Sequence, residues 1–301
     1  WHQIVDLEEC HLPSPEVGAL LGSVRAWAER EKVTPYNAHK SEGELRHLVI
    51  REAKNRPERM LTLVTSTGTI PKESFLEAVK SVYPATTVLL GRNKKLSDTA
   101  ISDSLEVLSG PGQITETLRF PDGSVDYRIS PQSFFQTNTH GAEVLYGLLR
   151  TWSRELKSRL LLDLYCGGGG IALALAAAAE KVIGVESNLS AVADAKSNAA
   201  LNELENCEFY GGQVEFLLPS LLDMKPDAAV VDPPRAGLHK SAVNALLENA
   251  PPVIFYVSCN PESLARDLKA LAPRYRAERI VVVDLFPHTE HVETVAWLTR
   301  R

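Results

Sequence analysis

The chain has 301 residues, of which 44% are hydrophobic and 23% charged, and its net charge is −6. This composition predicts a globular protein with room for two domains. No apolar run approaches the ~20 residues of a membrane-spanning helix and no signal peptide is visible, so we expect no membrane partner. The acidic balance also disfavours a broad cationic surface for nucleic acid. The basic clusters over 51–56 and 91–95 are most simply interpreted as solvated loops.

The four cysteines show no paired spacing along the chain: Cys10, Cys166, Cys207 and Cys259. Disulfide frameworks are typical of small secreted domains, whereas isolated thiols in a chain of this size are typical of a reducing compartment. We therefore expect free thiols, a cytoplasmic setting and a monomer.

Residues 1–128 are expected to form a small α+β domain. Apolar residues at helical spacing predict helices, and β-rich runs bounded by turn residues predict strands. The expected elements are helices over 13–31 and 73–82, and strands over 45–52, 59–66, 86–91 and within 105–130. A polar Lys-Asn-Arg-Pro turn joins the first two strands, which predicts a hairpin there.

Residues 129–301 are expected to form a second domain in which strands and helices alternate. Such alternation predicts a Rossmann-like α/β domain, with a mostly parallel sheet and helices on both faces. The expected strands are 160–165, 181–186, 207–211, 228–232 and 253–258. The expected helices are one that begins near 139 and contains Ala142, Leu145, Leu148 and Leu149, and others over 171–179, 189–203, 214–222, 240–249 and 261–271. Two further strands, over 279–286 and 293–299, predict a hairpin at the C-terminal end.

A glycine-rich turn, Asp163-Leu-Tyr-Cys-Gly-Gly-Gly-Gly170, stands between a strand and a helix. Glycines such as Gly167 and Gly169 let the backbone turn sharply and approach a ligand closely. Alone, this turn fits nucleotide, flavin and S-adenosylmethionine sites equally. Glu186 ends the next strand, where a carboxylate can accept hydrogen bonds from ribose hydroxyls. No Gly-Lys-Ser/Thr follows, which disfavours a P-loop, and the segment order favours S-adenosylmethionine over NAD.

Two more polar turns follow strands of the same sheet, so they are expected at the same ligand-binding edge. In the first, Asp232-Pro-Pro-Arg235, prolines stiffen the turn and hold the Asp232 carboxylate; the alternative is a helix cap. In the second, Ser258-Cys-Asn-Pro261, Cys259 opens a helix whose N-terminal amides favour a thiolate. The alternative is a small buried hydrophobe, the role expected of Cys166 and Cys207.

A nucleophilic cysteine beside a methyl donor makes sense for one difficult reaction. C5 of uracil is too poor a nucleophile to attack a sulfonium methyl group, but addition of a thiolate at C6 makes C5 reactive. A base must then remove the C5 proton before the thiol can leave. Glu293, at the start of the last predicted strand, is the candidate; the alternative is a surface carboxylate.

These segments together resemble the RNA uracil-C5 methyltransferases over essentially the whole chain. The matching segments are SPQSFFQTN (130–138), DLYCGGGG (163–170), GVE (184–186), DPPRAGL (232–238), VSCNPESLARDL (257–268) and LFPHTEHVETV (285–295). The resemblance implies a class I S-adenosylmethionine-dependent methyltransferase domain. The last segment is more similar to the ribosomal-RNA branch than to the transfer-RNA branch, which implies 23S ribosomal RNA as the substrate.

The resemblance also implies roles for individual residues. Cys259 would add to C6 of uracil, Glu293 would take the C5 proton, and Asp232 would lie where cofactor and uracil meet. Cofactor contacts are implied for Gln136, Tyr165, Glu186 and Gln213. At Gly170 the chain departs from the pattern, since relatives often carry Thr or Asn there.

Cys10 resembles the last cysteine of the four-cysteine iron–sulfur site found in relatives. A [4Fe–4S] cluster needs four ligands, so we expect no metal in this chain and a cluster only in a longer form. The small β-barrel RNA-binding domain of many relatives is also absent from the sequence.

Three alternatives stay open at this point. The enzyme could methylate an amino group, with Cys259 idle, or the fold could serve a non-catalytic RNA-binding or assembly protein. Cytosine-C5 methylation uses the same chemistry, but its enzymes place the cysteine in Pro-Cys or Thr-Cys motifs, which Ser258-Cys259 does not resemble.

Overall fold

The computed structural model describes residues 10–95 and 99–301, and the chain divides into two compact units. The smaller unit comprises Trp1–Glu116 and Ile129–Gln132, and the larger comprises Thr117–Arg128 and Ser133–Arg301. Each unit has its own sheet and hydrophobic core.

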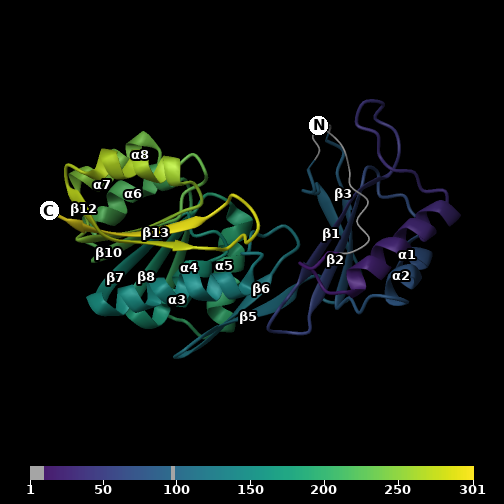
Figure 1. Ribbon diagram of the computed structural model, residues 1–301, viewed down its shortest axis with the longest axis horizontal. Helices are drawn as coiled ribbons and strands as arrows, with labels where there is room; N and C mark the ends of the chain where they lie inside the picture. The colour runs from purple at the N-terminus through teal and green to yellow at the C-terminus, as the bar shows by residue number, and fades with distance from the viewer. Residues whose placement is uncertain (1–9, 96–98) are drawn as a thin grey trace. The chain divides into compact units, whose positions relative to one another are not determined.

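The smaller unit packs two helices on one face of a four-stranded sheet (Figure 1). Its elements are α1 (Glu16–Arg30), β1 (Leu45–Glu52), β2 (Arg59–Thr65), α2 (Lys72–Lys80), β3 (Thr87–Arg92) and β4 (Ser104–Ser109). Strands β1 and β2 pair antiparallel as the predicted hairpin, whereas β2 and β3 are parallel and joined through α2. Trp27 and Phe75 meet between the helices, with ring centroids 5.0 Å apart. The α+β character predicted for this region is confirmed.

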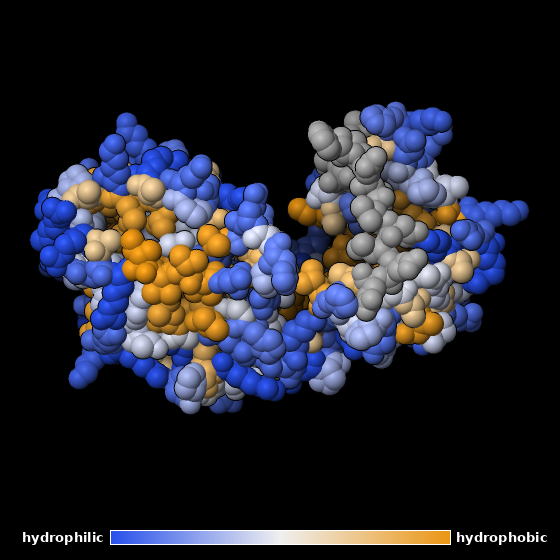
Figure 2. All heavy atoms as spheres, viewed as in Figure 1, coloured by the Kyte–Doolittle hydropathy of each residue, from blue (hydrophilic) through white to orange (hydrophobic). Residues whose placement is uncertain are grey.

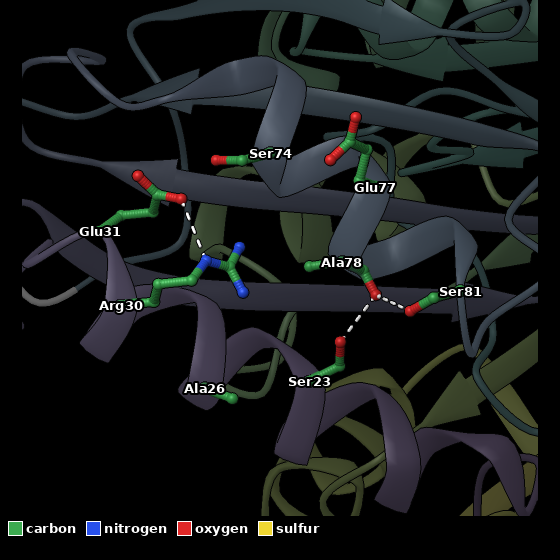
Figure 3. Close-up of a pocket in the computed structure, with 8 residues that line it drawn as sticks. All are labelled: Ser23, Ala26, Arg30, Glu31, Ser74, Glu77, Ala78 and Ser81. Carbon is green, nitrogen blue, oxygen red and sulfur yellow. Dashed lines mark hydrogen bonds and ion pairs between the residues drawn. The ribbon is translucent and has the colours of Figure 1, made fainter.

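A shallow pocket of about 460 Å³ lies between α1 and α2 (Figure 3). Its walls are mostly short side chains, and its serine hydroxyls are already used. Both Ser23 and Ser81 donate to the carbonyl of Ala78, at 2.8 and 2.9 Å. None of the residues predicted to bind a ligand lines this pocket, so the chemistry must be sought in the larger unit.

The larger unit is built on a seven-stranded sheet in the order β12-β13-β11-β10-β7-β8-β9. The strands are β7 (Ser158–Leu164), β8 (Ala179–Glu186), β9 (Cys207–Gly211), β10 (Ala228–Val231), β11 (Val253–Ser258), β12 (Tyr275–Val283) and β13 (Glu293–Arg300). The pairs from β11 through β9 are parallel, and β12 and β13 form the predicted antiparallel hairpin. Strand β13 pairs antiparallel with β11, so the hairpin extends the parallel sheet.

Helices cover both faces of this sheet (Figure 1). They are α3 (Thr139–Leu156), α4 (Gly170–Leu175), α5 (Leu189–Leu201), α6 (Val214–Asp223), α7 (Lys240–Glu248) and α8 (Pro261–Leu271). Leu161 packs with the α3, α4 and α5 side, whereas Leu160 and Leu162 pack with the α6, α7 and α8 side. Alternate residues of a strand point to opposite faces, and both faces are buried here, so the strand is apolar throughout. The Rossmann-like sheet predicted from the sequence is confirmed.

The hairpin of β5 (Ile114–Phe120) and β6 (Gly123–Ile129) joins the larger unit for most of its length. Two asparagines, Asn198 of α5 and Asn202 directly after it, bind the backbone of β6 with their side-chain amides. Asn198 accepts from the N–H of Arg128 at 2.8 Å, and Asn202 accepts from that of Asp126 at 2.8 Å. Residues 117–128 therefore belong to the larger unit, although the sequence placed them in the first domain, which was expected to end at residue 128. These bonds join positions about 70 residues apart, which no local pattern in the sequence reveals.

The outer edge of the large sheet is formed by β12, which is exposed along most of its length. Ile280 and Val282 are 56% and 61% exposed, and Figure 2 shows apolar side chains on this unit beside β12 and β13. Within residues 10–95 and 99–301, no helix is both long and apolar enough to cross a membrane.

Candidate active site

The predicted site residues meet at one edge of the large sheet because of strand direction. The parallel strands β7, β10 and β11 end there, and β13, running the other way, begins there. Ser258 pairs with Thr294, so Cys259, which follows β11, and Glu293, which begins β13, lie near each other, and the charge of Glu293 acts on the Cys259 thiol. Open α/β sheets hold their ligands at this carboxyl edge.

The glycine-rich turn leaves β7 through backbone conformations with positive φ. Gly167 and Gly169 have φ of 52° and 84°, and Tyr165 has φ of 67°. The positive φ favours glycine at position 169, and a Cβ there would also be crowded, since it would lie 3.1 Å from the Cβ of Ala195. A positive φ is costly for a tyrosine and is typical of functional sites.

Cys166, within the same turn, is buried and has a structural environment. Its N–H donates to the carbonyl of Val185 at 3.0 Å. Burial raises the pKa of the thiol, and the charges of Asp163 and Glu186 raise it further. A neutral, enclosed thiol agrees with the packing role expected for this cysteine.

Glu186 ends β8 with its carboxylate turned toward the glycine turn. One oxygen accepts from the N–H of Gly167 at 3.2 Å, and the other accepts from that of Asn188 at 2.7 Å. The carboxylate is thus positioned by backbone donors and is only half-buried. It remains accessible to the hydroxyls of a ribose.

The other predicted cofactor contacts differ in their burial. Gln136 is buried, and Gln213 is exposed at the residue preceding α6. Tyr165 is half-buried, and its hydroxyl donates to the carboxylate of Glu215 at 2.9 Å. Burial and this bond raise the pKa of Tyr165, so its hydroxyl is neutral. Glu215, which holds Tyr165, was not identified from the sequence.

Asp163, the first residue of the glycine-rich motif, is a buried carboxyl for which the sequence predicted no role. It is fully buried, and one oxygen accepts from the N–H of Ala172 at 2.8 Å. The other oxygen has no partner among the described residues. Burial and the charge of Glu186 raise the pKa of Asp163, whereas the bond to Ala172 lowers it. The result is a pKa of about 7. A carboxyl inside an otherwise apolar strand was the signal in the sequence.

Replacing Asp163 with Asn should make the protein more stable than wild type. The difference in unfolding free energy should grow as the pH rises from about 5 to about 7. The folded pKa of about 7 exceeds the ordinary value of 3.8, so folding takes up a proton between these values. Wild type therefore loses up to about 1.4 kcal/mol of unfolding free energy per pH unit as the pH rises through this window. The amide, which keeps the bond to Ala172, does not titrate. Urea unfolding of both proteins across this range measures the difference, and parallel curves would contradict it.

Cys259 is half-buried next to two carboxyls. Burial raises the pKa of its thiol, as do the charges of Glu293 and Asp232, while Arg235 lowers it. The expectation that the start of α8 favours a thiolate is therefore corrected. The backbone does lower the pKa, but less than burial and the two neighbouring carboxylates raise it. The resting thiol is neutral and must lose its proton before it can attack.

The carboxyl groups of Glu293 and Asp232 both have raised pKa values, so they hold their protons to a higher pH than exposed carboxyls do. Glu293 is 5% exposed, and burial raises its pKa to about 7. The pKa of Asp232 is raised well above its usual range by burial and by the charges of Glu293 and Asp163. Glu293 is therefore no ordinary surface carboxylate. It is poised near neutrality, where a general base works best.

Side chains of α8 connect the two polar turns. Asn260 caps α8 by accepting from the N–H of Glu262 at 3.1 Å, and its amide donates to the carbonyl of Arg235 at 3.1 Å. Asp267 accepts from the N–H of Leu238 at 2.7 Å. The turn that carries Asp232 is therefore positioned by the helix that follows Cys259.

The charge of this edge indicates the kind of ligand that fits it. Carboxyls from four strands converge here, and the pKa values of Asp163, Asp232 and Glu293 are all raised. Burial is the largest cause of each shift, and a positively charged ligand nearby would favour the ionised carboxylates. S-adenosylmethionine carries a sulfonium and an ammonium group, so the residues fit this cofactor.

Cys10 is free and exposed in the smaller unit. Among the described residues, no group of three or more His, Cys, Asp or Glu side chains is arranged to hold a metal ion. Its role as an iron–sulfur ligand in a longer chain stays a prediction.

Comparison with known proteins identifies the family of the chain. Residues 99–217 and 219–301 match the tRNA (uracil-5-)-methyltransferase family. An uncharacterized RNA methyltransferase of Clostridium tetani is 38% identical over 303 residues, covering 99% of this chain and 65% of the relative. One of Enterococcus faecalis is 37% identical over 307 residues, covering 99% of this chain and 66% of the relative. The chain thus spans about two thirds of these curated relatives.

A solved structure of the same family is also similar to this chain. It is the Pyrococcus abyssi tRNA (uracil-54, C5)-methyltransferase in complex with S-adenosyl-L-homocysteine, 36% identical, covering 99% of this chain and 70% of that chain. The TM-score of 0.84 identifies the larger unit as a class I methyltransferase domain. With its sheet edge, its glycine turn and these matches taken together, the chain belongs to the tRNA (uracil-5-)-methyltransferase family.

Proposed function

We propose that the chain transfers a methyl group from S-adenosylmethionine to C5 of a uridine in structured RNA. The observation that carries this proposal is the proximity of Cys259, directly after β11, and Glu293, at the start of the neighbouring strand β13, at the edge next to the glycine turn. One supplies a nucleophile and the other a buried base. A methyltransferase acting on an amino group would need neither.

Cys259 would act by forming a temporary bond to the pyrimidine. Its thiolate adds to C6, and the electrons of the C5–C6 bond move onto the O4 carbonyl to give an enolate. C5 of this enolate is nucleophilic enough to accept the methyl group, which the cofactor supplies as an electrophilic carbon. The uridine must leave its stack for the thiol to reach C6, as other base-modifying enzymes require.

Glu293 would act after the methyl group has been transferred. Its carboxylate removes the proton from C5, the C5–C6 double bond forms again, and the Cys259 thiolate leaves C6. The base must be ionised for this step. Because its pKa is raised to about 7, the release step should slow as the pH falls below neutrality.

The cofactor would be held by residues from several strand ends. Glu186 would accept hydrogen bonds from the ribose, and Gly167 and Gly169 would admit the cofactor close to the backbone. Further contacts would come from Gln136, Tyr165, Gln213 and Asp232.

Replacing Glu186 with Gln should weaken binding of S-adenosylhomocysteine by about tenfold. The amide keeps the shape of the side chain but gives up one acceptor and the charge that strengthens both ribose bonds. Calorimetry with S-adenosylhomocysteine measures the change. Glu208→Gln is the matched control, because that half-buried carboxylate lies on the neighbouring strand β9 and pairs with Lys181. A wild-type protein that binds no S-adenosylhomocysteine would instead favour a non-catalytic RNA-binding protein.

We propose 23S ribosomal RNA as the substrate, on the basis of the segment LFPHTEHVETV. Transfer RNA is the second candidate, because the Pyrococcus abyssi relative is named for position 54 of tRNA. Incubating the protein with labelled cofactor and each purified RNA, then mapping 5-methyluridine by mass spectrometry, tests both. Methylation of tRNA alone would overturn the ribosomal assignment.

We also propose that the protein works as a monomer in the cytoplasm. All four cysteines are free, which supports a reducing setting. Light scattering of the purified chain tests the oligomeric state.

A further inference from the structure

Tyr146 of α3 has a hydroxyl that the proposed chemistry does not use. The residue as a whole is 6% exposed, and its hydroxyl makes no hydrogen bond within the described part of the chain. The hydroxyl oxygen is not among the fully enclosed polar atoms that lack a partner in that part of the chain, so it is open to water or to a ligand. A tyrosine hydroxyl can both donate and accept a hydrogen bond.

The hydroxyl of Tyr146 lies directly over the end of the glycine turn. A Cβ added at Gly170 would lie 2.8 Å from the hydroxyl oxygen. Gly170 cannot move away freely, because its carbonyl accepts from the hydroxyl of Tyr127 at 2.9 Å. The absence of a side chain at Gly170 therefore makes room for the Tyr146 hydroxyl. The two residues form a matched pair.

The charges that act on this hydroxyl belong to the candidate active site. Asp232, Asp163 and Glu293 act on it electrostatically and, together with burial, raise its pKa. Glu186, the proposed ribose contact, is not among the charges that act on it in the described structure. The hydroxyl therefore lies close enough to these three carboxyls for their charges to act on it, and it stays neutral, able both to donate and to accept.

We propose that the Tyr146 hydroxyl contacts the amino-acid end of S-adenosylmethionine. The hydroxyl can take this position because Gly170 has no side chain. The identity of this ligand rests on the proposed function. The ammonium group of the amino-acid end can donate to the hydroxyl oxygen, and its carboxylate can accept the hydroxyl proton. Tyr146 would thus help to set the position of the adjacent sulfonium without taking part in bond making.

Replacing Tyr146 with Phe tests the contact, since it removes one oxygen and little else. We expect S-adenosylhomocysteine to bind about 3- to 10-fold more weakly, and 5′-methylthioadenosine, which lacks the amino-acid end, to bind as it does to wild type. Calorimetry measures both. Tyr275→Phe is the matched control, because that buried hydroxyl donates to the carbonyl of Pro251, remote from the glycine turn in sequence and on the outer strand.

The outcomes separate this inference from the proposed function. If wild type binds S-adenosylhomocysteine and Tyr146→Phe binds it equally well, the contact does not exist. An equal loss for both ligands would overturn the assignment to the amino-acid end. Failure of the wild type to bind either ligand would overturn the proposed function and this inference with it.

A double-mutant cycle tests the matched pair without any ligand. Gly170→Ser alone should lower the melting temperature of the free protein, because its Cβ meets the Tyr146 hydroxyl. In the Tyr146→Phe background the nearest ring carbon is 3.4 Å from that Cβ, so the same change should cost little, and the serine hydroxyl should restore part of the affinity for S-adenosylhomocysteine. Equal effects of Gly170→Ser in both backgrounds would show that the two positions are not coupled.

Discussion

Replacing Cys259 with Ala is expected to abolish methylation of RNA, with a loss on the order of 10⁴-fold or more, while S-adenosylhomocysteine still binds. Without the thiolate, C5 of uracil stays too weak a nucleophile to take the methyl group. The side chain is half-buried at a turn rather than in the core, so the fold should persist. Transfer of labelled methyl groups to RNA measures activity, and calorimetry measures binding.

Cys207→Ser is the matched control for this loss, because Cys207 is also a free, half-buried thiol of the larger unit, at the start of β9. It should retain full activity. Activity that survives in Cys259→Ala would exclude the covalent route and favour an enzyme that methylates an amino group.

Replacing Glu293 with Gln should have a different effect, because it blocks a later step. The thiol can still add to C6, but no base removes the C5 proton, so the methylated RNA stays attached to Cys259. We expect release to slow by about 10²- to 10⁴-fold and a covalent protein–RNA complex to accumulate. A denaturing gel with labelled RNA detects it.

The pH dependence of the wild type should reflect the same residue. Glu293 is protonated below its pKa of about 7, so turnover should rise with pH through neutrality. The raised pKa of Cys259 should extend this rise into the alkaline range, since the thiolate fraction still increases there.

Glu290→Gln is the control for Glu293, because Glu290 is an exposed carboxylate of the preceding loop. It should form no lasting adduct and should turn over normally. If Glu293→Gln releases its product as fast as wild type, another group must be the base.

The local elements and most of the candidate residues could be predicted from short-range patterns in the sequence. Period-two and period-3.6 patterns are short-range signals, so the strands, the helices and the alternation that predicts a parallel sheet could be identified. The glycine turn, Asp232 and Cys259 all follow strands, and parallel strands end at one edge. Their meeting at that edge therefore follows from the strand pattern alone.

Contacts between segments that are distant in the sequence could not be predicted and are visible only in the folded protein. Insertion of β13 next to β11 brings Glu293 near Cys259, and the approach of α3 sets Tyr146 against Gly170. The state of the Cys259 thiol depends on such contacts as well. A local feature, the start of α8, predicted a thiolate, but burial and carboxyls from two other strands raise the pKa. Electrostatic energy and desolvation depend on distances in space, which the order of residues along the chain does not specify.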